Sequence, residues 1–213
     1  MKKALIVVLG VGVAAFSISC TSFTYKPAIS LNASPKTIKA TVQIETFADE
    51  TPPADKWKQF GGVSATEPGT LAGELAIEVT DAVLTDFSNN LVFDAIKKKV
   101  EGEPDLIMNG RIHRFYGKAG PNAVFWFTIP VDIVWLCGVP VLRDKGEVDL
   151  EISLRRPGGP VLATYRAKSQ FGKWYTIYNN PTMGIGTRLN RAFSECIANI
   201  RQQIVNDAAK LSR

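Results

Sequence analysis

The chain of 213 residues has few of the side chains on which metal sites and acid–base catalysis usually depend. It has one histidine, His113, and three cysteines, none of them in a CxxC pair. This excludes a multi-histidine or zinc-ribbon metal centre. A phosphate-binding glycine loop, a dinucleotide fingerprint and a G-x-S-x-G nucleophile elbow are also missing. We therefore expect no metal, no cofactor and no enzymatic activity.

The few remaining polar candidates have simpler structural explanations. His113 lies within a predicted strand, which favours a solvated or hydrogen-bonded structural role. Glu147, Asp149 and Glu151 alternate along another predicted strand and so share one face. A charged face that resists sheet aggregation explains them better than paired catalytic acids do.

The charge of the chain is small, and no part of it is strongly basic. The net charge is +5, to which Lys2 and Lys3 contribute two. No basic run is interleaved with aromatic residues, so we expect no nucleic-acid partner. With 46% hydrophobic and 21% charged residues, the composition is typical of one globular domain.

The first twenty residues, MKKALIVVLGVGVAAFSISC, have the pattern of a secretory signal. Two lysines precede an apolar run over 4–16, and small residues lead to Cys20. The stretch resembles the lipobox of bacterial lipoproteins. This resemblance implies that residues 1–19 are removed and that Cys20 is diacylated. Ser17 stands where a large aliphatic residue is usual, so a plain secretory signal and an uncleaved anchor remain alternatives.

Beyond Cys20 we expect a flexible tether and one folded domain. Residues 20–36 are polar and contain two prolines, as linkers often do, and 37–213 form the domain. Alternation predicts strands over 37–47, 105–116 and 147–154, and the turn at 155–160 makes 161–171 the hairpin partner of the last one. The short apolar segment 91–96 could be a brief strand or a helical turn. Helical periodicity predicts helices over 70–87, with Thr70 as N-cap, and 187–210. In the loop 49–69, Trp57 and Phe60 could pack against the domain or form a surface that mediates binding.

This order of elements predicts an α+β fold. In it, a largely antiparallel sheet of four to five strands is covered on one face by two helices. The segment 84–116, with the runs LVFDAI and PDLIMNGRI, resembles small bacterial envelope lipoproteins in its layout. The YajG-like group and lipoproteins that assist transporters or lipopolysaccharide assembly share this layout. The resemblance implies an envelope location and no catalytic residues.

The apolar segment 123–142, AVFWFTIPVDIVWLCGVPVL, is the internal feature that a soluble domain does not obviously need. A transmembrane helix is disfavoured because two prolines interrupt it and Asp132 lies near its centre. The segment could form two buried strands or a hairpin. Alternatively, it could leave the domain and contact the bilayer interface or a partner. The contacting residues would then be Phe125, Trp126, Phe127, Ile129, Trp135 and Leu136.

Two further features have open interpretations. Trp174, Tyr175 and Tyr178 lie in an expected loop before the last helix, where aromatic residues could form an interface or pack into the core. Cys137 and Cys196 could form a disulfide in an oxidising compartment, or remain as buried free thiols.

Two functions fit these observations. The first is a non-enzymatic lipoprotein, anchored through acylated Cys20, that acts as a binding or assembly subunit of a membrane-associated complex with an envelope protein partner. The second is an accessory lipoprotein that binds or carries lipid through 123–142. Thr21, rather than Asp, follows the cysteine, and the lipoprotein resemblance then implies the outer membrane, facing the periplasm.

Overall fold

The computed structural model describes residues 24–29, 38–129, 133–179 and 181–212. The predicted signal peptide and Cys20 lie outside the described residues. The strands are β1 Ile38–Ile44, β2 Ala48–Asp49, β3 Val63–Ser64, β4 Phe93–Lys97, β5 Leu106–Pro121, β6 Leu142–Arg155 and β7 Val161–Tyr175. The helices are α2 Pro53–Lys56, α3 Leu75–Asn89, α4 Ala123–Thr128, α5 Ile133–Leu136, η2 Thr182–Gly184, α6 Ile185–Asn206 and α7 Ala208–Leu211.

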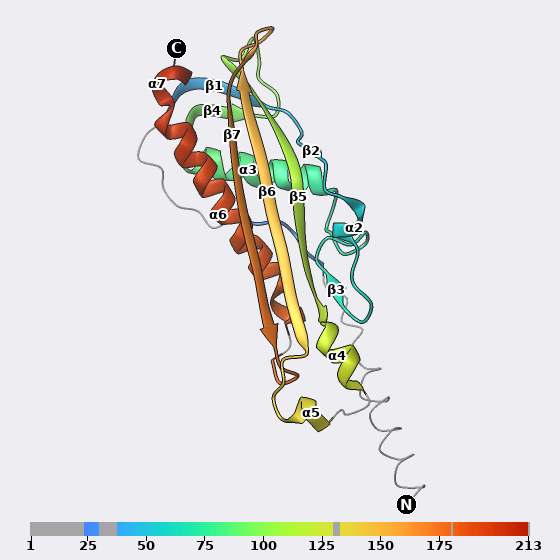
Figure 1. Ribbon diagram of the computed structural model, residues 1–213. Helices are drawn as coiled ribbons and strands as arrows, with labels where there is room; N and C mark the ends of the chain where they lie inside the picture. The colour runs from blue at the N-terminus through green and yellow to red at the C-terminus, as the bar shows by residue number, and fades with distance from the viewer. Residues whose placement is uncertain (1–23, 30–37, 130–132, 180, 213) are drawn as a thin grey trace, which may run out of the picture.

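The strands form one mixed sheet in the order β4-β1-β5-β6-β7, and the short strands β2 and β3 both pair with β5. β1 runs parallel to β4 and to β5, whereas β5, β6 and β7 are antiparallel neighbours. Parallel neighbours need a crossover connection, and α3 lies on the connection from β1 to β4. The result is a small parallel part joined to a long antiparallel one (Figure 1).

The long strands β5, β6 and β7 run the length of the molecule (Figure 1). β5 and β6 stay paired from Ile107 opposite Arg155 to Pro121 opposite Leu142, with one irregularity at His113. The extra residue there shifts the alternation, so that both Ile112 and Phe115 are buried. Without this bulge Phe115 would point to the opposite face of the sheet.

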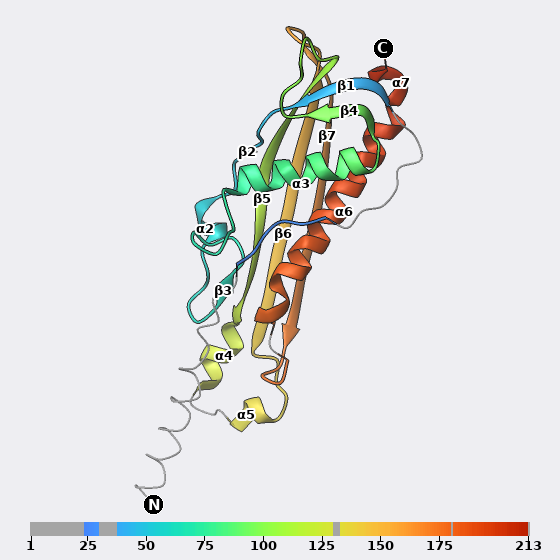
Figure 2. The ribbon, with the colours of Figure 1, turned by 180° about the vertical axis from the view of Figure 1, so that it is seen from behind.

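The two long helices lie on one face of the sheet, as Figure 2 shows. α6 places an apolar stripe on β5, β6 and β7, and its residues Leu189, Phe193, Ile197 and Ile200 are fully buried. α3 contributes Val79, Val83 and Phe87 to the same core. Burial of these two stripes is the main source of stability for the sheet.

A buried ion pair joins the two helices. Arg201 of α6 donates from Nη1 to both carboxylate oxygens of Asp86 in α3, at 2.8 and 2.6 Å. The Asp86 side chain is 0% exposed and that of Arg201 is 9% exposed. Asn90 also donates to the Asp86 carboxylate, so the buried charge has several partners.

The structure confirms the α+β class and a mostly antiparallel sheet. The sheet has seven strands in the described residues, more than the four to five expected, because β2 and β3 form within the predicted loop 49–69. α3 begins at Leu75, and Thr70 instead closes a turn by donating its hydroxyl to the carbonyl oxygen of Glu67. Trp57 and Phe60 are 54% and 84% exposed, so the expectation that they pack against the domain is wrong.

Part of the expected tether lies on the domain. Tyr25 is 4% exposed, and its hydroxyl donates to Oδ1 of Asn190 in α6 at 2.7 Å. Its backbone pairs with the segment 70–72. The chain is therefore held to the domain from residue 25, and the stretch between this point and Cys20 is short.

Candidate functional site

The segment 122–141 leaves the sheet at the end of β5 and returns at the start of β6. Asn122 closes its base: the side chain donates to the carbonyl oxygen of Pro140 at 3.0 Å, and the backbone N–H donates to Val141. The Asn122 side chain also accepts from the backbone N–H of Phe125 at 3.2 Å and so caps α4. Figures 1 and 2 show α4 and α5 beyond the same end of the long strands.

Aromatic packing gives this excursion an interior of its own. The rings of Phe125 and Trp135 stack with centroids 4.6 Å apart, and Trp126 meets Phe125 edge-on at 5.1 Å. The indole N–H of Trp135 donates to the hydroxyl of Thr128 at 2.7 Å. These contacts hold α4 against α5, and they therefore also fix where the other side chains of the two helices lie.

Those remaining side chains point away from the protein. Phe127 is 85% exposed, Leu136 is 64% exposed and Ile129 is 46% exposed. Phe60 of the 49–69 segment, 84% exposed, adds its ring to Trp126 at 5.4 Å. Large apolar side chains grouped in this way mark a site of contact with another molecule or with a membrane.

The predicted interface residues reach the same region from β7 and the turn that follows it. Trp174 is 48% exposed, with the guanidinium group of Arg143 5.5 Å from its ring centroid. Tyr178 is 64% exposed and donates its hydroxyl to the carbonyl oxygen of Leu136 at 2.8 Å. Tyr175 instead donates to Asp144 at 2.9 Å. We call this region, formed by Phe60, Trp126, Phe127, Ile129, Leu136, Trp174 and Tyr178, the aromatic end.

The structure rules out one of the interpretations of 123–142. Buried strands or a core hairpin are wrong, because the segment forms two short helices and, among its described residues, Val141 alone is buried. No helix in the described part of the chain is both long and apolar enough to cross a membrane. The contact residues expected from the sequence lie together, Phe125 and Trp135 as internal support and the others outward.

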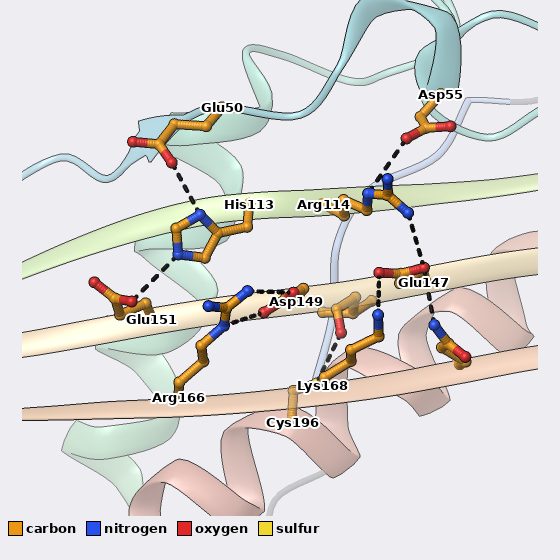
Figure 3. A network of polar contacts seen from close by, with 12 residues as sticks. Glu50, Asp55, His113, Arg114, Glu147, Asp149, Glu151, Arg166, Lys168 and Cys196 are labelled. Carbon is orange, nitrogen blue, oxygen red and sulfur yellow. Dashed lines mark hydrogen bonds and ion pairs between the residues drawn. The ribbon is translucent and has the colours of Figure 1, made fainter.

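The face of the sheet opposite the helices carries a network of charges (Figure 3). Arg166 donates to both oxygens of Asp149 at 2.8 Å each, and this pairing holds the pKa of Asp149 below its ordinary value. Lys168 lies 2.8 Å from Glu147. Glu147 and Asp149 of β6 are thus matched by cations of β5 and β7, as a structural charged face requires.

His113 belongs to the same network. Its ring nitrogens lie 2.9 Å from the carboxylate of Glu50 and 3.3 Å from that of Glu151. The bulge in β5 aims the ring between the carboxylates of Glu50 and Glu151 (Figure 3). The arrangement links the residue after β2 to β6 across β5 and fits the structural role expected from the sequence.

Both cysteines expected as a possible disulfide are free: Cys137 is exposed and Cys196 is buried. Cys137 follows α5 in the aromatic end, whereas the Cys196 thiol donates to the carbonyl oxygen of Val148 in the middle of β6. Burial raises the pKa of Cys196 to about 12. The two residues belong to different parts of the fold, a separation that their sequence spacing does not reveal.

A buried charge near the aromatic end was not predicted from the sequence. Asp144 is 0% exposed on the helix-covered face of β6 and is paired with Arg188 of α6. It also accepts from the backbone N–H of Lys173 at 2.7 Å. The sequence did contain a sign of it. Asp144 lies four residues before Val148, so alternation places both side chains on the inward face of the strand.

In the described part of the chain, neither a cavity nor a group of metal-ligating side chains indicates a further site. There, no group of three or more histidine, cysteine and acidic residues is arranged to hold a metal ion. One shallow pocket of about 250 Å³ lies at the opposite end of the sheet from α4 and is lined partly by Glu103, Asp105, Arg156 and Ser212. This volume is below the usual range for ligand pockets.

Comparisons with known proteins identify a fold but no family. No family model and no curated protein match the chain. Protein XCC0632 from Xanthomonas campestris, a DUF330 protein, has a similar structure with a TM-score of 0.50 and 10% identity, covering 88% of this chain and 95% of that one. This likeness shows a shared fold.

Two more distant solved structures have lower scores. An uncharacterised protein has a TM-score of 0.42 and 12% identity, covering 83% of this chain and 99% of its own. A lipoprotein candidate from Caulobacter crescentus CB15 has a TM-score of 0.35 and 10% identity, covering 62% and 83%. None of the three is described as YajG-like, so that part of the resemblance stays a prediction. The chain is thus similar in fold to an uncharacterised bacterial protein.

Proposed function

We propose that this protein is a bacterial envelope lipoprotein, anchored through acylated Cys20, that serves as a non-enzymatic binding or assembly subunit of a membrane-associated complex. The signal-like sequence ahead of Cys20 supports the anchor. The charged sheet face, whose acidic groups are paired with neighbouring cations, supports a structural rather than a catalytic role for the titratable residues.

One observation carries the proposal: the described chain is fixed on the domain a few residues after Cys20. Tyr25 is fixed on the domain, and Cys20 is four residues before Thr24. Four residues span about 14 Å at full extension. An acyl chain on Cys20 would therefore hold the domain within a short distance of the bilayer.

The alternative function, an accessory lipoprotein that binds lipid through 123–142, is supported by the exposure of Phe127 and Leu136. These side chains face outward and do not line an enclosed cavity. The geometry favours contact with lipid at a surface over carriage of a lipid inside the domain.

The test is mass spectrometry of the N-terminal peptide from the membrane fraction, combined with crosslinking of the intact envelope. We expect a diacylated Cys20 and one protein crosslinked in stoichiometric amount. A Cys20→Ala variant should lose the acyl mass. An unprocessed leader on an unacylated product contradicts the anchor, and extractable bound lipid without a protein partner favours the alternative.

A further inference from the structure

We infer that the aromatic end is a second membrane anchor, which inserts into the interfacial region of an anionic phospholipid bilayer independently of the acyl chain. The inference deepens the proposed function, in which Cys20 supplies the first anchor. It names the bilayer surface, rather than a protein, as the molecule that covers Phe127 and Leu136.

The chemical character of the aromatic end fits the interfacial region of a bilayer. Its outermost side chains are Phe127 and Phe60, 85% and 84% exposed, and Leu136, 64% exposed. Trp126 contacts the Phe60 ring, Tyr178 donates to Leu136, and Trp174 lies at the end of β7, all three with partly exposed rings. Tryptophan and tyrosine concentrate at this depth of membranes because each combines an apolar ring with a polar atom.

The charges beside these rings have the sign that anionic lipid attracts. The end of the sheet beside α4 and α5 carries three cations, Arg143 and Lys145 near the start of β6 and Lys173 near the end of β7. Among the residues that the structure describes, no carboxylate is within ion-pair distance of any of the three. Arg143 lies over the Trp174 ring and Lys173 over the Tyr175 ring. Cations placed next to interfacial aromatics add electrostatic attraction to apolar burial.

The point where the chain joins the domain is nearer to this end of the sheet than to the other. Tyr25 lies against Gly186, the second residue of α6, and the preceding Ile185 contacts Gly117 of β5. From Gly117, β5 runs four more residues to Pro121, about 13 Å, and ten residues back to Ile107, about 33 Å. The 14 Å reach from Thr24 to Cys20 therefore matches the aromatic end.

The two anchors would act on the same membrane. A diacylated Cys20 holds the chain at the bilayer but leaves the orientation of the domain free. The aromatic end adds a second point of contact and so sets the orientation, because β5, β6 and β7 run straight away from it (Figures 1 and 2). The charged sheet face would then stand clear of the bilayer, available to a protein partner.

The experiment separates the second anchor from the first by removing the acyl chain. The mature chain carrying Cys20→Ala, exported with a cleavable leader in place of residues 1–19, retains every described residue. It is mixed with vesicles of phosphatidylethanolamine and phosphatidylglycerol, and with phosphatidylcholine vesicles for comparison. Binding is measured by co-sedimentation and by tryptophan emission, since Trp126 and Trp174 lie in the aromatic end.

The test variant is Phe127→Ser with Leu136→Ser, and the matched control is Val161→Ser with Leu162→Ser. The control pair is 54% and 40% exposed and lies at the opposite end of the β6–β7 hairpin. We expect the parent to bind anionic vesicles, with a blue shift of its tryptophan emission. Its binding to phosphatidylcholine vesicles should be weaker. The test variant should bind at least about tenfold more weakly, because two large apolar side chains no longer leave water, and the control should match the parent.

Three outcomes overturn the inference: no binding by the acyl-free parent, equal binding by the test variant, or an equal loss in the control. Phe60→Ser, on a separate segment, should weaken binding in the same direction and guards against a local folding defect in α4. Failure here leaves acylation of Cys20 untouched, because mass spectrometry measures that modification independently. Conversely, vesicle binding by the acyl-free chain would persist even if Cys20 proved unmodified.

Discussion

The buried pair between Asp86 and Arg201 allows a quantitative prediction about stability. In an Arg201→Met variant the aliphatic part of the side chain is kept, and the cation that faces Asp86 is lost. Because the Asp86 side chain is 0% exposed, its carboxylate cannot recover hydration. Removing one partner of a buried pair costs about 3–5 kcal/mol, which is a large share of a typical domain stability.

The cost should also depend on pH with a definite sign. Burial raises the pKa of Asp86, and Arg201 opposes that rise. In Arg201→Met the opposing charge is gone, so the pKa of Asp86 in the folded variant rises further. A group with a raised folded pKa stabilises the fold below its unfolded pKa and loses that contribution as pH rises through the folded value. The free energy of unfolding of the variant should therefore be furthest below that of the parent at pH 8. The difference should shrink as the pH falls toward 5.

The assay is urea unfolding of the acyl-free mature chain, followed by far-ultraviolet circular dichroism at several pH values. Arg191→Met on the same helix is the matched control, since the Arg191–Glu195 pair is 83% and 53% exposed and is worth about 0.3–0.5 kcal/mol. Replacing both buried partners, as Asp86→Leu with Arg201→Met, should restore most of the loss. A loss below about 1 kcal/mol, or one that does not change with pH, would refute the reasoning.

Three further predictions follow from single contacts. In the native protein an alkylating reagent should modify Cys137 rapidly and Cys196 only after unfolding, because Cys196 is buried and its pKa is raised to about 12; mass spectrometry of the labelled peptides reports this. Gly110→Ala should destabilise the fold by about 1–3 kcal/mol in urea unfolding, because a Cβ there would lie 2.4 Å from the Phe47 ring. Asp149→Asn should lower stability at pH 7, and the difference from the parent should shrink below about pH 4, because the lowered pKa of Asp149 makes its stabilisation present above the unfolded pKa and lost as the pH falls.

Each of these predictions has a contrary result. Equal labelling of both thiols would place Cys196 at the surface. Gly172→Ala is the control for Gly110, because a Cβ there meets only Asp144 at an ordinary 3.5 Å, and an equal loss in both variants would contradict the steric argument. A stability difference for Asp149→Asn that does not decrease at all as the pH falls below about 4 would separate the effect from its ionisation.

Much of the fold follows from local patterns in the sequence. Strict alternation identified β6, the turn at 155–160 then identified β7 as its hairpin partner, and the apolar stripe of the last helix predicted the buried face of α6, from Leu189 to Ile204. The strand near Leu91–Ile96 forms as β4. These elements were predictable because each repeats its apolar residues with the period of its own secondary structure.

The sequence predicted many of the residues of the candidate site, but it did not predict how they come together in space. The sequence singled out 123–142 for its apolar length, and it also favoured buried strands there, because a short apolar run satisfies either interpretation. Phe60 and Arg143 were not connected to the site, since they reach it from other segments. The proximity of Tyr178 to Leu136, 42 residues apart, was equally invisible.

The sequence alone determined the periodic elements, the scarcity of metal-binding and catalytic groups, and the signal-like start with Cys20. Tertiary structure alone decided the parallel pairing of β1 with β4, the pairing of Asp86 with Arg201 across 115 positions, and the outward position of Phe127. The physical reason is that periodicity records which side of an element avoids water, whereas partner choice depends on how all elements share one core. An apolar segment stays outside when that core is already filled, as it is here by α3 and α6.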